Sequence, residues 1–266
     1  MENILKSHKI SHFGFVSFQH LNILPVRSRR RIPHNCTRAV AMVFPYYNKS
    51  AFGGNISAYC SVRDYHTVVM MQLKSICEAR RRKYPGHSFV PFVDSSPVDE
   101  VDMAVKAGLG VKGRNSLLIT PHSGSWVFIG EILTTLPLPT TCFENPGCLD
   151  CGLCRKACPG GAISQGVCTE KCASHISQKK GTLTEEETHN LSKARTVFGC
   201  DICQTVCPMN RNISESENLF TEDIQNTIDP ATLPRVYKSR PYGWRGLATL
   251  QRNLAIYTAR QKDKED

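Results

Sequence analysis

Residues 147–163 read GCLDCGLCRKACPGGAI, and the rest of the chain is interpreted outward from this stretch. Its four cysteines, Cys148, Cys151, Cys154 and Cys158, follow the spacing C-x2-C-x2-C-x3-C-P. In runs of this kind the first three thiolates hold one [4Fe-4S] cluster and the fourth reaches another. The short loop also lets backbone N–H groups point at the cluster sulfurs. The stretch therefore predicts a site for iron–sulfur clusters.

A second cysteine run, FGCDICQTVCPMN at residues 198–210, ends in the same C-x3-C-P pattern. If the two runs exchange their last cysteines, the first cluster is held by Cys148, Cys151, Cys154 and Cys207. The second cluster then lacks one ligand, because the remaining cysteines of the runs are Cys158, Cys200 and Cys203. The candidates for the missing ligand lie between the runs, at Cys168 and Cys172. The sequence thus predicts two neighbouring [4Fe-4S] clusters.

Structural zinc is the main alternative, because C-x2-C pairs also bind Zn²⁺. Two C-x3-C-P endings and the regular spacing of both runs favour clusters over zinc. Disulfides are less favoured still, since tight C-x2-C pairs suit metals in a reducing compartment and no signal peptide is expected. Most of the other cysteines are expected to be buried free thiols: Cys36, Cys60, Cys77, Cys142 and whichever of Cys168 and Cys172 is unused.

Composition bounds the class of protein. A chain of 266 residues can form one large domain or two modest ones. No apolar run approaches the roughly 18 residues of a membrane span, so we expect a soluble, cytoplasmic protein without a membrane partner. The formal charge of +10, from 33 Lys and Arg against 23 Asp and Glu, favours a polyanionic partner.

The basic residues gather in two groups: Arg27, Arg29, Arg30 and Arg31, and Arg80, Arg81, Arg82 and Lys83. Either group could equally be a solvated loop or helix end.

Hydrophobic periodicity predicts an α+β protein, with an α/β body followed by the cluster module. The apolar run AVAMVFPYY at residues 39–47 indicates a central strand buried on both faces. Further strands are expected over residues 12–18 and 87–93, and a hairpin from residues 116–120 and 125–133. Helices are expected over residues 58–84, 97–107, 184–194 and 244–260. We expect three parts: a body (1–140), a ferredoxin-like module (141–212) and a helical tail that packs on the body (213–266).

Capping signals support two of these helices. Ser95 or Ser96 is expected as an N-cap, with Pro97 at the first helical position and Gly108 past the end. Thr184 opens a T-x-x-E capping box. In the last helix the basic side chains are expected to face outward or meet a phosphate, at Arg245, Arg252 and Arg260.

Taken together, these motifs resemble the epoxyqueuosine reductase family, the cobalamin-dependent iron–sulfur enzymes of tRNA queuosine synthesis. The matching segments keep the family's order and cover roughly residues 39–260. Besides the first cysteine run they are RDYH (63–66), PFVD (91–94) continued by SSPV (95–98), KAGLGVKGRNSLLI (106–119), CAS (172–174), FGCDICQTVCPMNR (198–211) and RNLA (252–255). The cysteine runs alone would fit any two-cluster module, whereas their combination with the SSPV and AGLG segments is specific.

The resemblance implies a cobalamin-binding body joined to a ferredoxin-like module, and it implies Cys172 as the missing cluster ligand. It also implies that Asp94 donates a proton during catalysis, and we expect burial at the end of the apolar FVPFV strand to keep this acid protonated. A structural alternative is that Asp94 caps the next helix. The family's cobalamin-lining positions fall on Asn115, Ser174, Cys200 and Asp201, together with Asp94 and, more loosely, Cys60.

The resemblance further implies an activity: reduction of epoxyqueuosine to queuosine in tRNA by cobalamin that two [4Fe-4S] clusters supply with electrons. The expected partners are the tRNA anticodon arm and an external electron donor, and the expected state is a monomer. The alternatives are a cobalamin-dependent reductase of another substrate and a plain two-cluster electron carrier. Departures from the family pattern keep these open: Val111 replaces an aromatic residue, Met209 replaces Trp, and the family's C-terminal helical-repeat extension is expected to be missing.

Overall fold

The computed structural model describes residues 1–141, 147–217 and 219–262, so the predicted buried thiol Cys142 lies outside the described residues. The chain divides into two compact units. The first comprises residues 1–45, 65–113 and 117–148, and the second comprises residues 46–64, 114–116 and 149–266. Mixed helix and sheet content is confirmed, while the predicted division into three parts stays a prediction.

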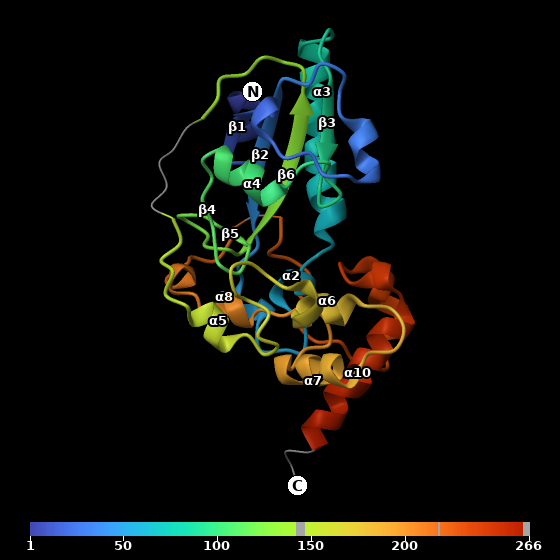
Figure 1. The fold of residues 1–266 in the computed structure, drawn as a ribbon. Helices are drawn as coiled ribbons and strands as arrows, with labels where there is room; N and C mark the ends of the chain where they lie inside the picture. Colours follow the sequence, from blue (N-terminus) through green and yellow to red (C-terminus); the bar gives the residue numbers. More distant parts are fainter. Residues whose placement is uncertain (142–146, 218, 263–266) are drawn as a thin grey trace. The chain divides into compact units, whose positions relative to one another are not determined.

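The first unit is built on one four-stranded sheet with the strand order β1-β2-β6-β3 (Figure 1). Its strands are β1 (Phe13–Ser17), β2 (Arg38–Pro45), β6 (Val127–Thr134) and β3 (Phe89–Phe92), and every pairing is antiparallel. The six interior residues of β2 are buried, and β2 pairs on both edges. The predicted central strand is therefore confirmed.

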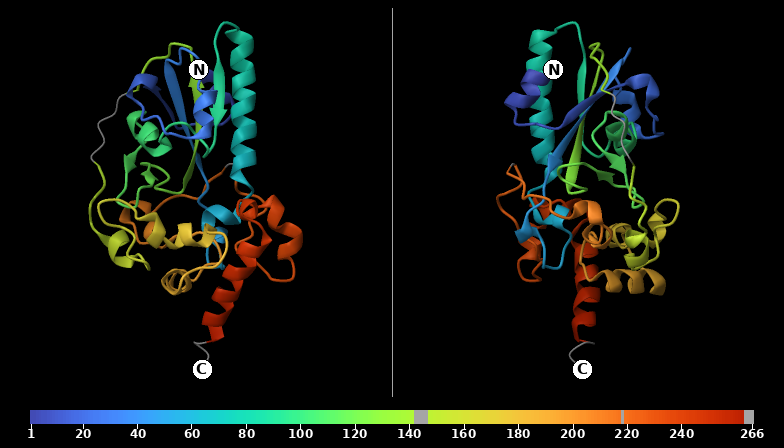
Figure 2. Two further views of the ribbon diagram at one scale, coloured as in Figure 1. Left: turned by 45° about the vertical axis from the view of Figure 1, so that its right-hand side comes forward. Right: turned by 90° about the vertical axis from the view of Figure 1, so that its left-hand side faces the viewer.

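A helix covers each face of this sheet, as Figures 1 and 2 show. α3 (Tyr65–Lys83) packs on β3 and β6, and α4 (Glu100–Lys106) packs on β1, β2 and β6. Gly130 of β6 leaves room for this packing, because a Cβ there would lie 2.7 Å from Phe44 Cε2 and 3.0 Å from Val69 Cγ1. Burial on both faces explains why β2 reads as a continuous apolar run.

Two local predictions differ from the structure. The helix expected over residues 58–84 is split into α2 (Ala58–Ser61) and α3, with a break before Tyr65. The predicted hairpin is reduced to one antiparallel bridge between Thr120 and Gly124. Beyond it, β5 (Leu118–Ile119) pairs with β4 (Val111–Lys112), while β6 enters the main sheet. β6 pairs with eight residues of β2, and this pairing buries far more apolar surface than a hairpin with a two-residue strand could.

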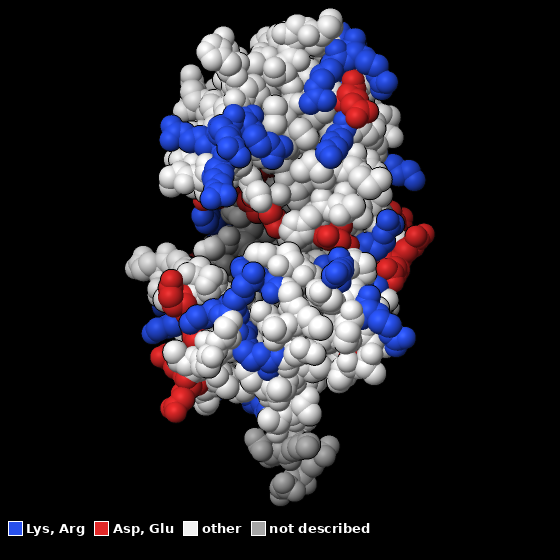
Figure 3. All heavy atoms as spheres, turned by 90° about the vertical axis from the view of Figure 1, so that its right-hand side faces the viewer, with Lys and Arg blue, Asp and Glu red and all other residues white. Residues whose placement is uncertain are grey.

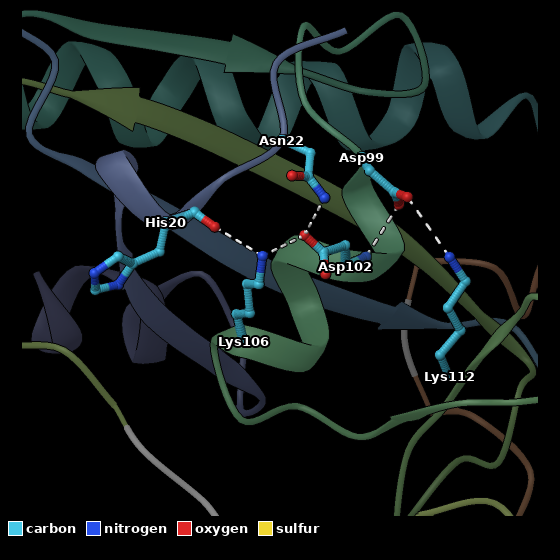
Figure 4. Close-up of polar contacts among 6 residues, drawn as sticks. All are labelled: His20, Asn22, Asp99, Asp102, Lys106 and Lys112. Atoms are coloured by element: carbon cyan, nitrogen blue, oxygen red, sulfur yellow. Dashed lines mark hydrogen bonds and ion pairs between the residues drawn. The ribbon is translucent and has the colours of Figure 1, made fainter.

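The start of α4 also differs from the prediction. Its N-cap is Asp99, whose side chain accepts a hydrogen bond of 3.0 Å from the Asp102 N–H, whereas Ser95 or Ser96 was expected (Figure 4). Lys106 adds an ion pair of 2.8 Å to Asp102. The hydroxyl of Ser96 lies outside this helix start: it donates to a carboxylate oxygen of Glu131 and accepts the Val98 N–H at 3.3 Å. Gly108 follows the helix with φ +80°, as predicted.

The second unit consists of short helices around the cysteine runs and of a long final helix. The helices are α5 (Leu153–Ala157), α6 (Ala173–Gln178), α7 (Glu185–Ala194), α8 (Ile202–Thr205), α9 (Leu233–Val236) and α10 (Leu247–Lys262). The capping box of α7 is confirmed, since Thr184 and Glu187 exchange side-chain to backbone hydrogen bonds. The predicted last helix is confirmed with a later start, as α10.

α10 is anchored on the rest of its unit by two polar residues. Asn253 is fully buried, and its Nδ2 donates to the carbonyls of Ser177 (2.7 Å) and Val197 (2.8 Å). Arg252 donates from Nη1 to the carbonyls of Lys179 (2.7 Å) and Gly181 (2.5 Å). The outward or phosphate-binding role expected for Arg252 is therefore wrong, because its guanidinium is used to hold the chain together.

The remaining elements are short. α1 (Glu2–Ser7) opens the first unit. 3-10 turns cover Phe18–His20, Arg27–Arg31, Lys49–Ala51, Thr169–Lys171, Pro208–Asn210, Tyr237–Ser239 and Gly243–Arg245. None of the helices in the described part of the chain is long and apolar enough to cross a membrane.

Candidate iron–sulfur and catalytic sites

Four of the predicted cluster ligands come together in the second unit: Cys158, Cys172, Cys200 and Cys203. The pKa of both Cys200 and Cys203 is raised to about 12, chiefly by burial and in smaller part by the nearby thiols of Cys158 and Cys172. The backbone N–H of Ala162 donates a hydrogen bond of 3.2 Å to Cys158 Sγ. Four thiols facing one another, with a backbone N–H directed at sulfur, form a donor set suited to a [4Fe-4S] cluster.

The spacing of these thiols differs from that of a mononuclear site. Within residues 1–141, 147–217 and 219–262, no three Cys, His, Asp or Glu side chains are gathered as ligands of a single metal ion. A cubane binds each thiolate at a separate iron corner, so its ligands stand farther apart than those of one ion.

The other predicted ligands lie in loops next to two short helices. Cys151 is exposed, while Cys154 and Cys207 are partly buried. Cys154 belongs to α5 and Cys207 follows α8, and these two helices pack against each other. Cys148, partly buried, is the last residue of the first unit.

The thiols outside the predicted clusters differ in exposure. Cys60 and Cys77 are fully buried as predicted, whereas Cys36 is partly buried. Cys168 is exposed and donates to Glu170 Oε2 at 3.3 Å, so the expectation of a buried spare thiol is wrong at this position. The hydrophilic loop around residue 168 offers no apolar surroundings for it.

Two predicted cofactor-binding residues lie beside the four-thiol group. Asn115 is buried and hydrogen-bonds the thiol of Cys203 through its side chain. Asp201 accepts a hydrogen bond from the Ser57 hydroxyl and another of 2.6 Å from the Ala58 N–H, which fixes the start of α2. Burial raises the pKa of Asp201, and these two hydrogen bonds partly offset the shift.

Two further residues that were predicted to contact cobalamin, Ser174 and Cys60, have other contacts in the structure. Ser174 is partly buried in α6, where its carbonyl accepts a 2.7 Å hydrogen bond from Ser177. Cys60 has no exposed surface and packs in an apolar cluster with Ile56, Val197, Phe198, Tyr242 and Leu250, among others. The cofactor contacts assigned to both residues stay predictions.

Asp94 lies in the first unit, two residues past β3, with φ +57°. Tyr65 donates a 2.6 Å hydrogen bond from its hydroxyl to Asp94 Oδ2, and His66 Nε2 lies 2.9 Å from the same oxygen. The Asp94 side chain is 44% exposed, so the expected burial of this acid is wrong. It does not cap α4 either, because Asp99 takes that role. The carboxylate is therefore anchored on one oxygen and open to solvent.

Two acids near Asp94 were missed from the sequence, the buried Glu131 and the partly buried Glu100. Glu131 is fully buried between Ala41 and Phe92 of the neighbouring strands, and its Oε1 has no hydrogen-bond partner among the described residues. Burial raises its pKa to about 8, against the opposing effect of the Ser96 hydrogen bond, and the charge of Asp94 adds to the rise. The pKa of Glu100 is also raised well above its usual value. The largest cause is burial, and the charges of Asp94 and Glu131 follow. The sequence could have predicted a buried acid at Glu131, because this residue lies inside the apolar run VFIGEIL.

The grouped thiols of the second unit define the chain as one that contains an iron–sulfur module. Residues 147–210 match the family model described as 4Fe-4S double cluster binding domain, and residues 28–95 match the model described as Epoxyqueuosine reductase QueG, DUF1730. The chain is thus similar to the epoxyqueuosine reductase family over residues 28–95, and residues 147–210 match a domain that binds two [4Fe-4S] clusters.

Individual relatives agree with this assignment. The chain is 35% identical over 217 residues to the epoxyqueuosine reductase of Listeria monocytogenes, covering 76% of this chain and 56% of that protein. The chain thus spans about half the length of the curated relatives it matches. In fold it is similar to the epoxyqueuosine reductase of Streptococcus thermophilus, with a TM-score of 0.83, 23% identity, and coverage of 98% of this chain and 80% of that one. It is also similar to an epoxyqueuosine reductase structure containing an epoxyqueuosine-modified tRNA-Tyr stem loop, with a TM-score of 0.80, 23% identity, and coverage of 98% and 81%.

Proposed function

We propose that this chain reduces epoxyqueuosine in tRNA to queuosine, with two [4Fe-4S] clusters and cobalamin as its cofactors. The observation that carries the proposal is the match of residues 28–95 to the epoxyqueuosine reductase model, because this segment ends at the anchored, solvent-open carboxylate of Asp94. The overall change is epoxide plus two electrons and two protons to alkene plus water. The chain must therefore supply both an electron path and a proton donor.

The proposed cluster ligands are the cysteines of the two runs and Cys172. The first set is Cys148, Cys151, Cys154 and Cys207, and the second is Cys158, Cys172, Cys200 and Cys203. The mutual approach of the second set supports Cys172 over the exposed Cys168 as its fourth member. For the cobalamin contacts we propose Asn115, Ser174, Cys200, Asp201, Cys60 and Asp94. Asn115 and Asp201 fit this role best, as polar side chains beside the second thiol set.

Bound cobalamin would supply the low-potential electrons that open the epoxide, and the clusters would deliver those electrons one at a time. Asp94 would transfer a proton to the epoxide oxygen as its C–O bond breaks. Tyr65 and His66 both engage Asp94 Oδ2, so the other oxygen, Oδ1, is the atom that would face the substrate. Holding one oxygen fixes the orientation of the carboxyl group, which lowers the entropic cost of the proton transfer.

The tRNA would bind through phosphate contacts with exposed basic side chains. In the first basic group, Arg31 is committed to the protein, since Nη2 donates to the Pro91 carbonyl at 3.1 Å and its guanidinium lies 4.5 Å from the Phe92 ring. In the second group Arg80 is buried and Arg81 donates to the Phe89 carbonyl. The exposed members that remain for phosphates are Arg27, Arg29, Arg30, Arg82 and Lys83.

The face drawn in Figure 3 carries Lys and Arg side chains in several separate groups, with Asp and Glu side chains beside some of them. Such a distribution favours contacts with several phosphates along a backbone. Binding should therefore weaken steeply with salt. For each phosphate that is neutralised, a tenfold rise in salt concentration should lower the affinity about tenfold. A flat salt response would remove the tRNA part of the proposal.

The proposal is tested by reconstituting the chain anaerobically with iron, sulfide and cobalamin and assaying it on epoxyqueuosine-containing tRNA. Asp94→Asn should abolish queuosine formation while the cluster absorbance and the cobalamin spectrum stay unchanged. Asp102→Asn, which removes a carboxylate on α4 that pairs with Lys106, is the matched control and should retain activity. An active Asp94→Asn enzyme would contradict the assigned role. Cluster-loaded protein that takes up no cobalamin would instead indicate a plain electron carrier.

A further inference from the structure

Two large apolar side chains are exposed beside a predicted ligand of the first cluster. Leu149 is 63% exposed and Leu153 is 38% exposed, and the exposed Cys151 lies midway between them in the chain. Large apolar side chains that gather at an exposed site, rimmed by polar residues, are typical of protein interaction surfaces. They are unusual in a loop whose other task is to hold a metal cluster.

Basic side chains surround these leucines. Arg155 and Lys156, near the end of α5, are both exposed. Arg114 donates hydrogen bonds of 2.6 Å from both Nε and Nη2 to the two carboxylate oxygens of Asp150. Three positive groups against one negative group leave this face with a net positive charge.

A cavity of about 280 Å³ opens on the same face. Its lining is polar and consists of Arg114, Asp150, Gly152, Arg155, Ser164 and Gln165. Two guanidinium groups, a hydroxyl and an amide at one opening can hold a carboxylate, because all of them offer hydrogen-bond donors. The cavity and the two leucines together form a surface with an apolar centre and a basic rim.

We propose that this surface, composed of Arg114 and residues 149–156 with Ser164 and Gln165, is the docking site for a small acidic electron-carrier protein. The carrier gives up one electron and is oxidised, and the first cluster accepts it at the side of Cys151 and is reduced, so no bond or proton changes. The inference rests on the first cluster of the proposed function, but not on its tRNA substrate. Two such encounters supply the two electrons of each turnover.

Several features favour a protein over RNA as the occupant. Residues 147–165 contain no aromatic side chain, so there is nothing on which an unpaired base could stack. The Asp150 carboxylate, 59% exposed, is paired with Arg114, which leaves the exposed Arg155 and Lys156 to attract an acidic protein. Transient redox complexes use small interfaces and rely on complementary charge for fast encounter. A compact basic rim around an exposed cluster edge fits that requirement.

The test measures cluster reduction in the complete, cluster-loaded chain without any tRNA. A photoreduced acidic flavodoxin serves as the probe carrier, and bleaching of the cluster absorbance is followed by stopped flow at low ionic strength. Arg155→Glu combined with Lys156→Glu should lower the second-order rate constant at least tenfold. Leu149→Ser combined with Leu153→Ser should lower it by a smaller factor, with an unchanged dependence on salt. The matched control is Met71→Ser with Lys74→Glu, which alters an exposed apolar and basic pair on α3, and it should react like wild type.

Reduction by dithionite and iron content are recorded for every variant, because both report on the cluster without a protein partner. The proposal is supported if only the flavodoxin rate falls. It is overturned if the charge-reversed variant reacts within twofold of wild type, or if the wild-type rate is insensitive to salt between about 20 and 500 mM. It is also overturned if the variant loses affinity for an RNA stem-loop while its flavodoxin rate is unchanged. Since epoxide reduction is not involved, failure here leaves the proposed function intact.

Discussion

The hydroxyl of Tyr65 donates a 2.6 Å hydrogen bond to Asp94 Oδ2, so the first residue of α3 holds the acid that follows β3. Tyr65 is itself fixed, because it is 8% exposed and its ring stacks on Phe128 with 4.1 Å between centroids. His66 approaches the same carboxylate oxygen. Asp94, in a left-handed backbone conformation, is thus oriented from a rigid helix.

Tyr65→Phe should lower turnover on epoxyqueuosine tRNA by about two- to tenfold, because a hydrogen bond contributes about 0.5–1.5 kcal/mol. The ring still packs on Phe128, so the unfolding temperature should change little. Turnover and thermal unfolding are measured on the same preparation, with Tyr84→Phe at the end of α3 as control. Wild-type turnover in Tyr65→Phe would show that Asp94 needs no orientation from this residue.

Glu131 should make the first unit less stable as pH rises. Its pKa is about 8 in the folded state and about 4.5 when solvated, so only the folded state holds the proton between these values. Stability is then full below about pH 4.5 and is lost by a few kcal/mol as pH rises through about 8. Glu131→Gln should flatten the fall in unfolding temperature between pH 5 and pH 8.5, since the amide can still accept from Ser96 but cannot ionise. An equally steep fall in this variant would exclude Glu131 as its source.

Cys172→Ser should remove one cluster, lowering the bound iron from roughly eight to roughly four atoms per chain. Cys168→Ser is the matched control, because the thiol of Cys168 is exposed and donates a hydrogen bond to Glu170. Its loss should leave the iron content unchanged. Iron and sulfide are assayed after anaerobic reconstitution. If Cys168→Ser lost half of the iron and Cys172→Ser lost none, Cys168 would be the fourth ligand of the second cluster.

Asn253→Ala should destabilise the second unit by about 2–4 kcal/mol. The change leaves the buried carbonyls of Ser177 and Val197 without their donor, and each unsatisfied group costs about 1–3 kcal/mol. Chemical denaturation of the cluster-loaded protein measures the loss. Gln251→Ala, at an exposed position on the same helix, should change stability by less than about 0.5 kcal/mol.

Gly199→Ala should cost more than Gly181→Ala, although both glycines have positive φ, +75° and +79°. An added Cβ at Gly181 meets nothing, so this variant pays only the backbone cost of about 1–2 kcal/mol. At Gly199 the same Cβ would overlap the side chain of Ser57, which adds about 1–3 kcal/mol. Equal losses of unfolding temperature in the two variants would contradict this packing.

Several features of the fold followed from local sequence patterns. The apolar run of β2, the capping box at Thr184 and the glycine after α4 were predicted correctly. Each depends on residues within a few positions of one another, where the chain's own geometry limits the alternatives. The cysteine runs likewise indicated the double-cluster domain, because the reach of a short loop dictates which thiolates can share a cluster.

The remaining features depended on contacts between distant segments. Ser96 does not cap α4, which begins at Glu100; its hydroxyl donates to Glu131, thirty-five residues away, and accepts from the Val98 N–H. Arg252 serves backbone carbonyls instead of phosphate, and β6 pairs with β2 instead of β5. In each case the partner lies far along the chain, where a local sequence pattern gives no signal for it.

By itself the sequence determined the resemblance to a family, the cluster-binding cysteines as candidates and the main strand of the sheet. Only the tertiary structure decided that Cys172 approaches Cys200 and Cys203, that Asp94 stays open to solvent, and that Glu131 is the acid kept out of water. The reason is physical: spacing along the chain sets what a short loop can bind, whereas burial and the protonation of an acid are set by neighbours that only the folded chain brings together.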